Sequence, residues 1–148
     1  VNSIKVMDDG TGGIIKTYNA DGKSTIYLGT GGGAGGGQLR TYNADSKETV
    51  YLGSGEGGIG ILTTYNADGK ETVYLGTGEG GSGFLETNNT DGKQTAYLGT
   101  APDGSGKLHT SNKHGVDVGY FGANKNGDGM ALLYDRYGDI GWSAIGKK

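Results

Sequence analysis

The chain has 148 residues, a formal net charge of −3, 34 glycines, one proline and no cysteine. Because acidic and basic side chains are interspersed, the chain lacks the basic stripe that nucleic-acid binding requires, and the absence of cysteine excludes disulfides and thiolate chemistry. No apolar run approaches the ~20 residues of a membrane-spanning helix, and the glycines do not recur at every third position as in collagen.

The chain begins with a short apolar segment and then repeats one motif. Residues 1–7 look like the second strand of an incomplete repeat, with Ile4 and Val6 at apolar positions. The motif TYNADGKSTIYLGTG follows, and its copies are offset by 24 residues at the first step and by 23 at each later step. The copies begin at Thr17, Thr41, Thr64, Thr87 and, in a weaker form, Thr110. A fixed period is typical of arrays, so we assign tandem repeats to residues 1–111 and divergent terminal repeats to residues 112–148.

Each repeat predicts two short strands and two turns. In the third copy, side chains of alternating character run from Leu62 to Tyr65 and again from Thr72 to Leu75. Period-two alternation of Thr, Val, Tyr and Leu is a strand signal. The sequence Asn-Ala-Asp-Gly between the two segments supplies turn chemistry. Glycine-rich stretches such as residues 76–83 are better explained by tight corners than by a phosphate site, because no helix pattern follows them.

Stacking the copies predicts which side chains share an interior. Residues two apart on a strand point to the same face, so the apolar columns on the two strands of each repeat should face inward together, with a threonine column beside them. The predicted core ladders contain Leu39, Leu62, Leu85, Val50, Val73, Leu52, Leu75 and Leu98. Ten tyrosines and these regular aliphatic positions argue against a disordered linker.

Two tyrosine columns are predicted on the opposite, outward face. One accompanies each YLG segment and the other lies beside a variable, charged column on the first strand. These residues are Tyr27, Tyr51, Tyr74, Tyr97, Tyr42 and Tyr65. Stacked aromatic rings suit lateral contacts between fibres or stacking on sugar rings, while the alternative is that tyrosines and threonines simply stiffen the sheet.

The apolar content per repeat is small for a protein that folds alone. Three inward aliphatic side chains per repeat do not offset the entropy lost on ordering the remaining residues of the repeat. We therefore expect an all-β, repeat-built β-helix or β-prism of 23- to 24-residue units in which three chains pool their apolar stripes as an intertwined homotrimer. A single-chain parallel β-solenoid and a meander of consecutive hairpins are the alternatives.

The repeat decays towards the C-terminus. Bulkier apolar residues appear there, including the one tryptophan of the chain. Terminal units of an array need to cover its open end, so these residues are predicted to form either a cap or a segment that joins subunits. The residues concerned are Tyr137, Ile140, Trp142 and Ile145.

Neither a metal site nor a catalytic centre is expected. Each NADGK turn offers one carboxylate beside a lysine, which disfavours a cation. The segment NKNGDGMALLYD from Asn124 has EF-hand-like spacing, but it falls where other copies have a glycine-rich corner. The two histidines, His109 and His114, occupy a variable outward position and a turn position, so neither suits a triad. We expect no cofactor and no enzymatic activity.

Residues 17–122, with DGK turns and YLG strands, resemble the glycine-rich repeat shafts of phage tail fibres and of bacterial surface or secreted fibre proteins. The resemblance implies a trimeric β-helical shaft on a cell or virion exterior, and it carries no catalytic residue. The expected function is a structural fibre or filament subunit whose main partner is itself. The alternative is a carbohydrate-binding module that uses its tyrosine ladders on surface glycans.

Overall fold

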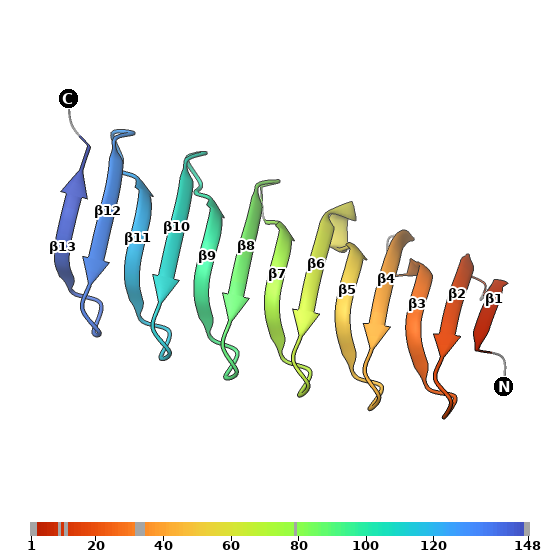
Figure 1. The fold of residues 1–148 in the computed structure, drawn as a ribbon. Helices are drawn as coiled ribbons and strands as arrows, with labels where there is room; N and C mark the ends of the chain where they lie inside the picture. Colours follow the sequence, from red (N-terminus) through yellow and green to blue (C-terminus); the bar gives the residue numbers. More distant parts are fainter. Residues whose placement is uncertain (1–2, 9, 11, 32–34, 79, 147–148) are drawn as a thin grey trace. The chain divides into compact units, whose positions relative to one another are not determined.

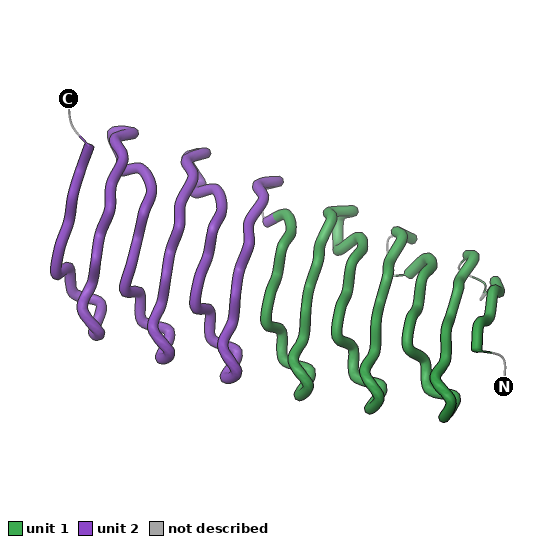
Figure 2. The backbone as a smooth tube through the Cα atoms, viewed as in Figure 1, with its two compact units in different colours: residues 1–77 green, residues 78–148 purple. Residues whose placement is uncertain are grey.

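The structure is a computed structural model, and it describes residues 3–8, 10, 12–31, 35–78 and 80–146. The chain forms two compact units, residues 1–77 and residues 78–148 (Figure 2). The strands of the first unit are β1 (Ile4–Asp8), β2 (Gly13–Tyr18), β3 (Ser24–Gly31), β4 (Gly36–Tyr42), β5 (Glu48–Ser54), β6 (Gly60–Tyr65) and β7 (Glu71–Thr77), with a 3-10 turn η1 (Glu56–Gly58) before β6. The strands of the second unit are β8 (Gly83–Asn88), β9 (Gln94–Thr100), β10 (Gly106–Ser111), β11 (Asp117–Ala123), β12 (Gly129–Tyr134) and β13 (Ile140–Ile145).

Within each unit, every strand pairs antiparallel with its neighbours in the chain (Figure 1). In the first unit, for example, Leu39 of β4 lies opposite Leu28 of β3 on one side and Leu52 of β5 on the other. The all-β prediction is confirmed. The pairing is that of the meander, and it differs from the parallel pairing of a single-chain solenoid. Two strands joined by a five-residue NADGK turn can pair with each other only antiparallel, because a parallel pair needs a crossover of about a dozen residues or more.

The NADGK turns close by hydrogen bonds of the asparagine at their start. In the third copy, the Gly69 amide donates to the Asn66 carbonyl at 2.9 Å, and Asn66 Oδ1 accepts from the amides of Asp68 and Lys70 at 2.9 and 3.0 Å. Gly69 has a φ of +82°, a left-handed conformation that glycine adopts without steric cost. The DGK motif is therefore explained by turn geometry.

The turn lysines connect neighbouring hairpins. Lys47 Nζ donates to the carbonyl of Ala67 at 2.8 Å, and Lys23 Nζ donates to the carbonyl of Ala44 at 2.6 Å. The second unit repeats this contact between Lys93 and the His114 carbonyl at 2.9 Å. These three lysines thus hold the tip of the next hairpin, which gives the lysine of the turn a structural role.

Ser46 occupies the turn position that is glycine in the neighbouring copies, and its φ is +63°. A left-handed conformation costs a residue with a Cβ roughly 1–2 kcal/mol, partly offset by the lower entropy of its unfolded chain. We expect Ser46→Gly to stabilise the protein by about 1 kcal/mol in urea unfolding. The reverse exchange, Gly69→Ser, is the matched control and should destabilise it by a similar amount. Equal stability of all three chains would show that the turn carries no strain.

Each NADGK hairpin also contains a β-bulge next to its turn. In the third copy Thr64 lies opposite Val73 and Tyr65 lies opposite Glu71, so Thr72 is the extra residue. A bulge of this kind redirects a side chain. Here it brings the Thr72 hydroxyl to 2.8 Å from that of Thr64, so a threonine pair forms on the same face as the aliphatic ladders.

Candidate functional site: the two faces of the sheet

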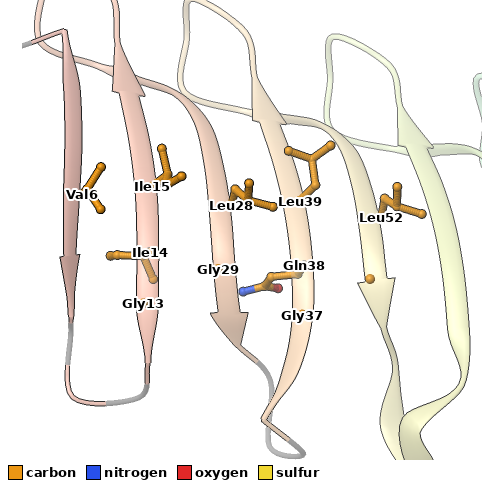
Figure 3. A pocket seen from close by; sticks show the side chains of 11 residues that line it. Val6, Gly13, Ile14, Ile15, Leu28, Gly29, Gly37, Gln38, Leu39 and Leu52 are labelled. Carbon is orange, nitrogen blue, oxygen red and sulfur yellow. The ribbon is translucent and has the colours of Figure 1, made fainter.

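The strands of each unit have two chemically different faces. We call the face that carries the predicted core ladders the aliphatic face and the opposite one the tyrosine face. Figure 3 shows the start of the aliphatic row in the first unit, which contains Val6, Ile15, Leu28, Leu39 and Leu52. The next members follow by register, since Leu62 lies opposite both Leu52 and Leu75. In the second unit Leu85 lies opposite Leu98.

The charged side chains of the described strands lie on the tyrosine face, apart from Asp8 at the end of β1. The register shows this directly, because Arg40 lies opposite Tyr27 and Tyr51, and Glu86 lies opposite Tyr97. The other charged strand residues on this face are Lys5, Lys16, Glu48, Glu71, Lys107 and Asp117. The aliphatic face therefore has no charged side chain within its described rows beyond β1.

The predicted core ladders are not enclosed within one chain. Leu52, Leu75 and Leu98 expose 48%, 47% and 54% of their surface, and Leu39, Leu62, Leu85, Val50 and Val73 are half-buried. The buried side chains among the described residues are Ile14, Gln38 and Thr63, and of these Ile14 is fully buried. All three lie on the tyrosine face, in the rows next to the tyrosines or their glycines. One chain thus covers its tyrosine face better than the face predicted to be its core.

The tyrosines of the YLG segments lie along their own strands. Tyr51 donates its hydroxyl hydrogen to the carbonyl of Ser54 at 2.8 Å, and Tyr27 makes the same bond to Thr30 at 2.6 Å. The glycine two positions after each tyrosine permits this, because a Cβ at Gly76 would lie 2.9 Å from Cε1 of Tyr74. The YLG motif is therefore a tyrosine packed over a glycine of the same strand. Sequence reasoning had placed these tyrosines on an outward strip, whereas their rings are half-buried and their hydroxyls bind their own backbone.

Paired charges surround the tyrosines of the first unit. The Arg40 guanidinium lies 5.0 Å from the ring centre of Tyr51, 3.2 Å from the Glu48 carboxylate, and donates to Gln38 Oε1 at 2.9 and 3.0 Å. In the second tyrosine column, burial raises the pKa of Tyr42 and of Tyr65 above the ordinary value, so both remain neutral hydroxyls at neutral pH. This face is polar and internally paired, as expected of a face that meets water.

The threonine pairs leave the aliphatic face with satisfied hydroxyls. In the third copy the Thr72 hydroxyl donates to the Thr64 carbonyl at 3.1 Å. The Thr64 hydroxyl can then donate its hydrogen to the Thr72 hydroxyl oxygen across the short contact between them. The equivalent pairs are Thr17–Thr25, Thr41–Thr49 and Thr87–Thr95, with Oγ1 atoms 2.7, 2.7 and 2.9 Å apart. Burying a hydroxyl costs free energy mainly when it has no hydrogen-bond partner. Since these threonine hydroxyls are paired, they are compatible with a dry interface. Sequence reasoning missed the second member of each pair, although a threonine recurs there in four copies.

The C-terminal residues predicted to cap or join subunits do not form one patch. Tyr137, Ile140, Trp142 and Ile145 are exposed by 71%, 62%, 53% and 44%. Trp142 pairs with Leu133 on the aliphatic face, whereas Ile145 pairs with Met130 on the other face. Trp142 therefore extends the aliphatic face into β13, while Ile140 and Ile145 contribute to the opposite side. Whether they join subunits stays a prediction.

The polar clusters have turn or strand geometry. Asn124 Oδ1 accepts from the amides of Asn126 and Asp128, so the EF-hand-like segment begins with an ordinary turn of the array. In the part of the chain that the structure describes, no group of three or more His, Asp or Glu side chains lies together. Asp117 accepts from the Ser111 hydroxyl at 3.0 Å and lies 3.3 Å from Nε2 of His109. A triad needs the histidine between the serine and the acid, and here the acid is in the middle.

No protein-family model matches the chain, and no curated protein matches it. Among the described residues, none of the helical structure is long and apolar enough to cross a membrane.

Proposed function

We propose that the chain is a non-catalytic structural subunit of an extracellular fibre or filament, and that its copies associate through their aliphatic faces. One observation carries the proposal: in the described strands beyond β1, the face with the aliphatic ladders has no charged side chain and is left open, while the charged strand residues lie on the other face. A contiguous exposed apolar face of this kind marks an interaction site. The satisfied threonine pairs support burial of the same face.

The size of the aliphatic face fits association between copies. Seven strands about 4.8 Å apart and about five residues of ~3.4 Å each give the first unit a face of roughly 34 by 17 Å, or about 570 Å². The second unit has a further six strands. A standard stable interface buries about 800 Å² per partner. The aliphatic faces of the two units together are large enough for such an interface.

Three copies suit this face better than one or two. The apolar stripe is narrow, because it consists of the leucine row and the adjacent row of Thr, Ile and Val. Three narrow stripes that face a common axis enclose a slender interior, which is the β-prism form of the homotrimer. In this arrangement all charged strand residues except Asp8 stay outside.

Changes along the array support packing of each hairpin against the same hairpin of other copies. In the fifth copy Phe121 replaces the ladder leucine while Gly119 replaces valine. In the last hairpin the leucine row carries Ala131 and Ala144, and the adjacent row carries Leu133 and Trp142. Within one hairpin, a larger side chain in one row is thus accompanied by a smaller side chain in the adjacent row. Such compensation preserves close packing only where identical hairpins meet.

Single cysteines test this arrangement, because the natural chain has none. Leu28→Cys, Leu52→Cys and Leu75→Cys place one thiol each on the aliphatic face of the first unit. A short bis-maleimide spans distances that a disulfide cannot. It should link two chains that carry cysteine at the same position, and it should not link two chains that carry cysteine at different positions. In a trimer, at most two of the three chains can be joined in this way. A monomeric mass in native mass spectrometry, without cross-links, would contradict the proposal.

The alternative function is glycan binding by the tyrosine ladders. The geometry supports it less, because the hydroxyls of Tyr27 and Tyr51 are bound to their own strands and cations lie beside both rings. The regular ladder of the first unit therefore looks like strand reinforcement. The second unit interrupts this regularity at Phe84, which lies opposite Gly99.

A further inference from the structure

The tyrosine face of the second unit contains a hollow of about 720 Å³ beside the turns that follow β7 and β9. This volume is in the range of small-ligand sites. Its described lining consists of Gly78, Gly80, Ser82, Phe84, Tyr97, Thr100, Ala101, Pro102, Gly104 and Lys107. Among the described residues of this lining, Lys107 is the one with a charged side chain.

The hollow is built where the array departs from its own pattern. Phe84 lies opposite Gly99, at the row position that carries Gln38 and Ile61 in earlier copies. Lys107 occupies the same row one hairpin later. The turn beside it holds Pro102, the one proline of the chain. Three departures from the repeat therefore lie around one hollow.

The departures create an aromatic wall next to a cation. The rings of Phe84 and Tyr97 are stacked, with centres 5.4 Å apart and planes inclined by 16°. Lys107 Nζ lies 4.7 Å from the Tyr97 ring centre. Because β9 lies between β8 and β10, Tyr97 has Phe84 on one side and Lys107 on the other.

The remaining lining supplies room and hydroxyl groups. Gly78, Gly80 and Gly104 bring no side chains into the hollow, while Ser82 and Thr100 line it with hydroxyls. An aromatic wall packs against the C–H groups of a sugar ring, hydroxyls bond its hydroxyls, and an ammonium pairs with a carboxylate. A neutral sugar would leave Lys107 without a partner, and a phosphate ion would leave the aromatic wall unused.

We propose that this hollow binds a uronic acid residue of an acidic polysaccharide. Lys107 pairs with the sugar carboxylate, and the parts of Phe84 and Tyr97 that line the hollow contact the sugar ring. The site is on the opposite face from the one proposed for assembly. A fibre with this site on its exterior would hold acidic surface polysaccharide without occupying its own interface.

The test is a titration of the isotopically labelled protein by two-dimensional NMR. The probes are a galacturonic acid trisaccharide, the neutral galactose trisaccharide and inorganic phosphate. The acidic sugar should shift the amide signals of residues 80–82, 100, 101, 103 and 104 and bind more weakly as salt is added. The neutral sugar should bind at least about tenfold more weakly, as expected for loss of a charge-assisted hydrogen bond, and phosphate should not shift these signals.

The variants Phe84→Ile and Lys107→Gln install residue types that other copies carry at the same row, so both should fold. Lys107→Gln should lower the affinity for the acidic sugar about tenfold or more and leave the affinity for the neutral sugar unchanged. Phe84→Ile should lower the affinity for both sugars. Lys16→Gln, which alters the cation beside Tyr27, is the control and should change neither. Equal affinity for the two sugars, equal shifts with phosphate, or unchanged binding by Lys107→Gln would each overturn the proposal. The mass of each variant's assembly is measured separately. Loss of sugar binding can therefore be distinguished from loss of the proposed assembly.

Discussion

The substitution Leu52→Lys is expected to dissociate the assembled protein into single chains. Leu52 lies between Leu39 and Leu62 in the aliphatic row of the first unit and is 48% exposed in one chain. In the proposed interior, an ammonium would be buried without a partner, which costs several kcal/mol per ion. Since 1.4 kcal/mol corresponds to a factor of ten, the midpoint concentration for dissociation should rise at least about a hundredfold. Sedimentation equilibrium over a dilution series measures it.

The matched control is Gln94→Lys, which adds the same charge near the end of a strand on the tyrosine face. It should leave the association midpoint within about a factor of three, because an exposed charge interacts weakly in water. If both variants dissociate equally, general charge repulsion and not the aliphatic face controls assembly. If neither does, the copies do not meet through this face.

Gly53→Ala is expected to destabilise the fold by about 2 kcal/mol, within the range for overpacked sites. A Cβ at this position would lie 2.8 Å from both the Cβ of Gln38 and the carbonyl oxygen of Gly37. The carbonyl is backbone and cannot move aside, so β4 and β5 would have to separate locally. The free energy of unfolding in urea, taken at a concentration at which both proteins have the same mass, measures the effect.

Gly37→Ala is the comparison for this change. Gly37 is in the neighbouring strand on the aliphatic face, and a Cβ there would have no atom within 4 Å. We expect a change of less than about 0.5 kcal/mol. A similar loss for both variants would mean that any side chain in place of a strand glycine is unfavourable, and the packing account of the YLG motif would then be wrong.

These two experiments address different faces of the same strands. The tyrosine face is completed within the chain, because glycines such as Gly76 and Gly99 receive one side chain from their own strand and one from the preceding strand. On the aliphatic face the paired threonine hydroxyls have hydrogen-bond partners, but the leucines remain partly exposed. Stability of the meander and assembly of its copies should therefore respond to different substitutions, which gives each proposal its own readout.

Much of the local structure followed from the residues alone. The period of the motif predicted repeated strand pairs, and period-two alternation correctly grouped Leu62 with Leu75 on one face and Tyr74 on the other. The turn at Asn66 to Lys70 was predicted from its asparagine and glycine, whose conformational preferences are local. The bulge beside the turn was not predicted, because a bulge depends on how two strands register against each other.

The sequence by itself determined the strands, the turns and the division of side chains between two faces, since these depend on interactions over a few residues. Only the tertiary structure decided how consecutive strands pair and which face the chain covers for itself. The tyrosine face is covered because Tyr74, Tyr97 and Tyr120 lie over glycines of their own strands, a contact that hydropathy does not encode. The leucines remain open in each unit because a single layer of strands, however regular its pattern, has no second layer to bury them.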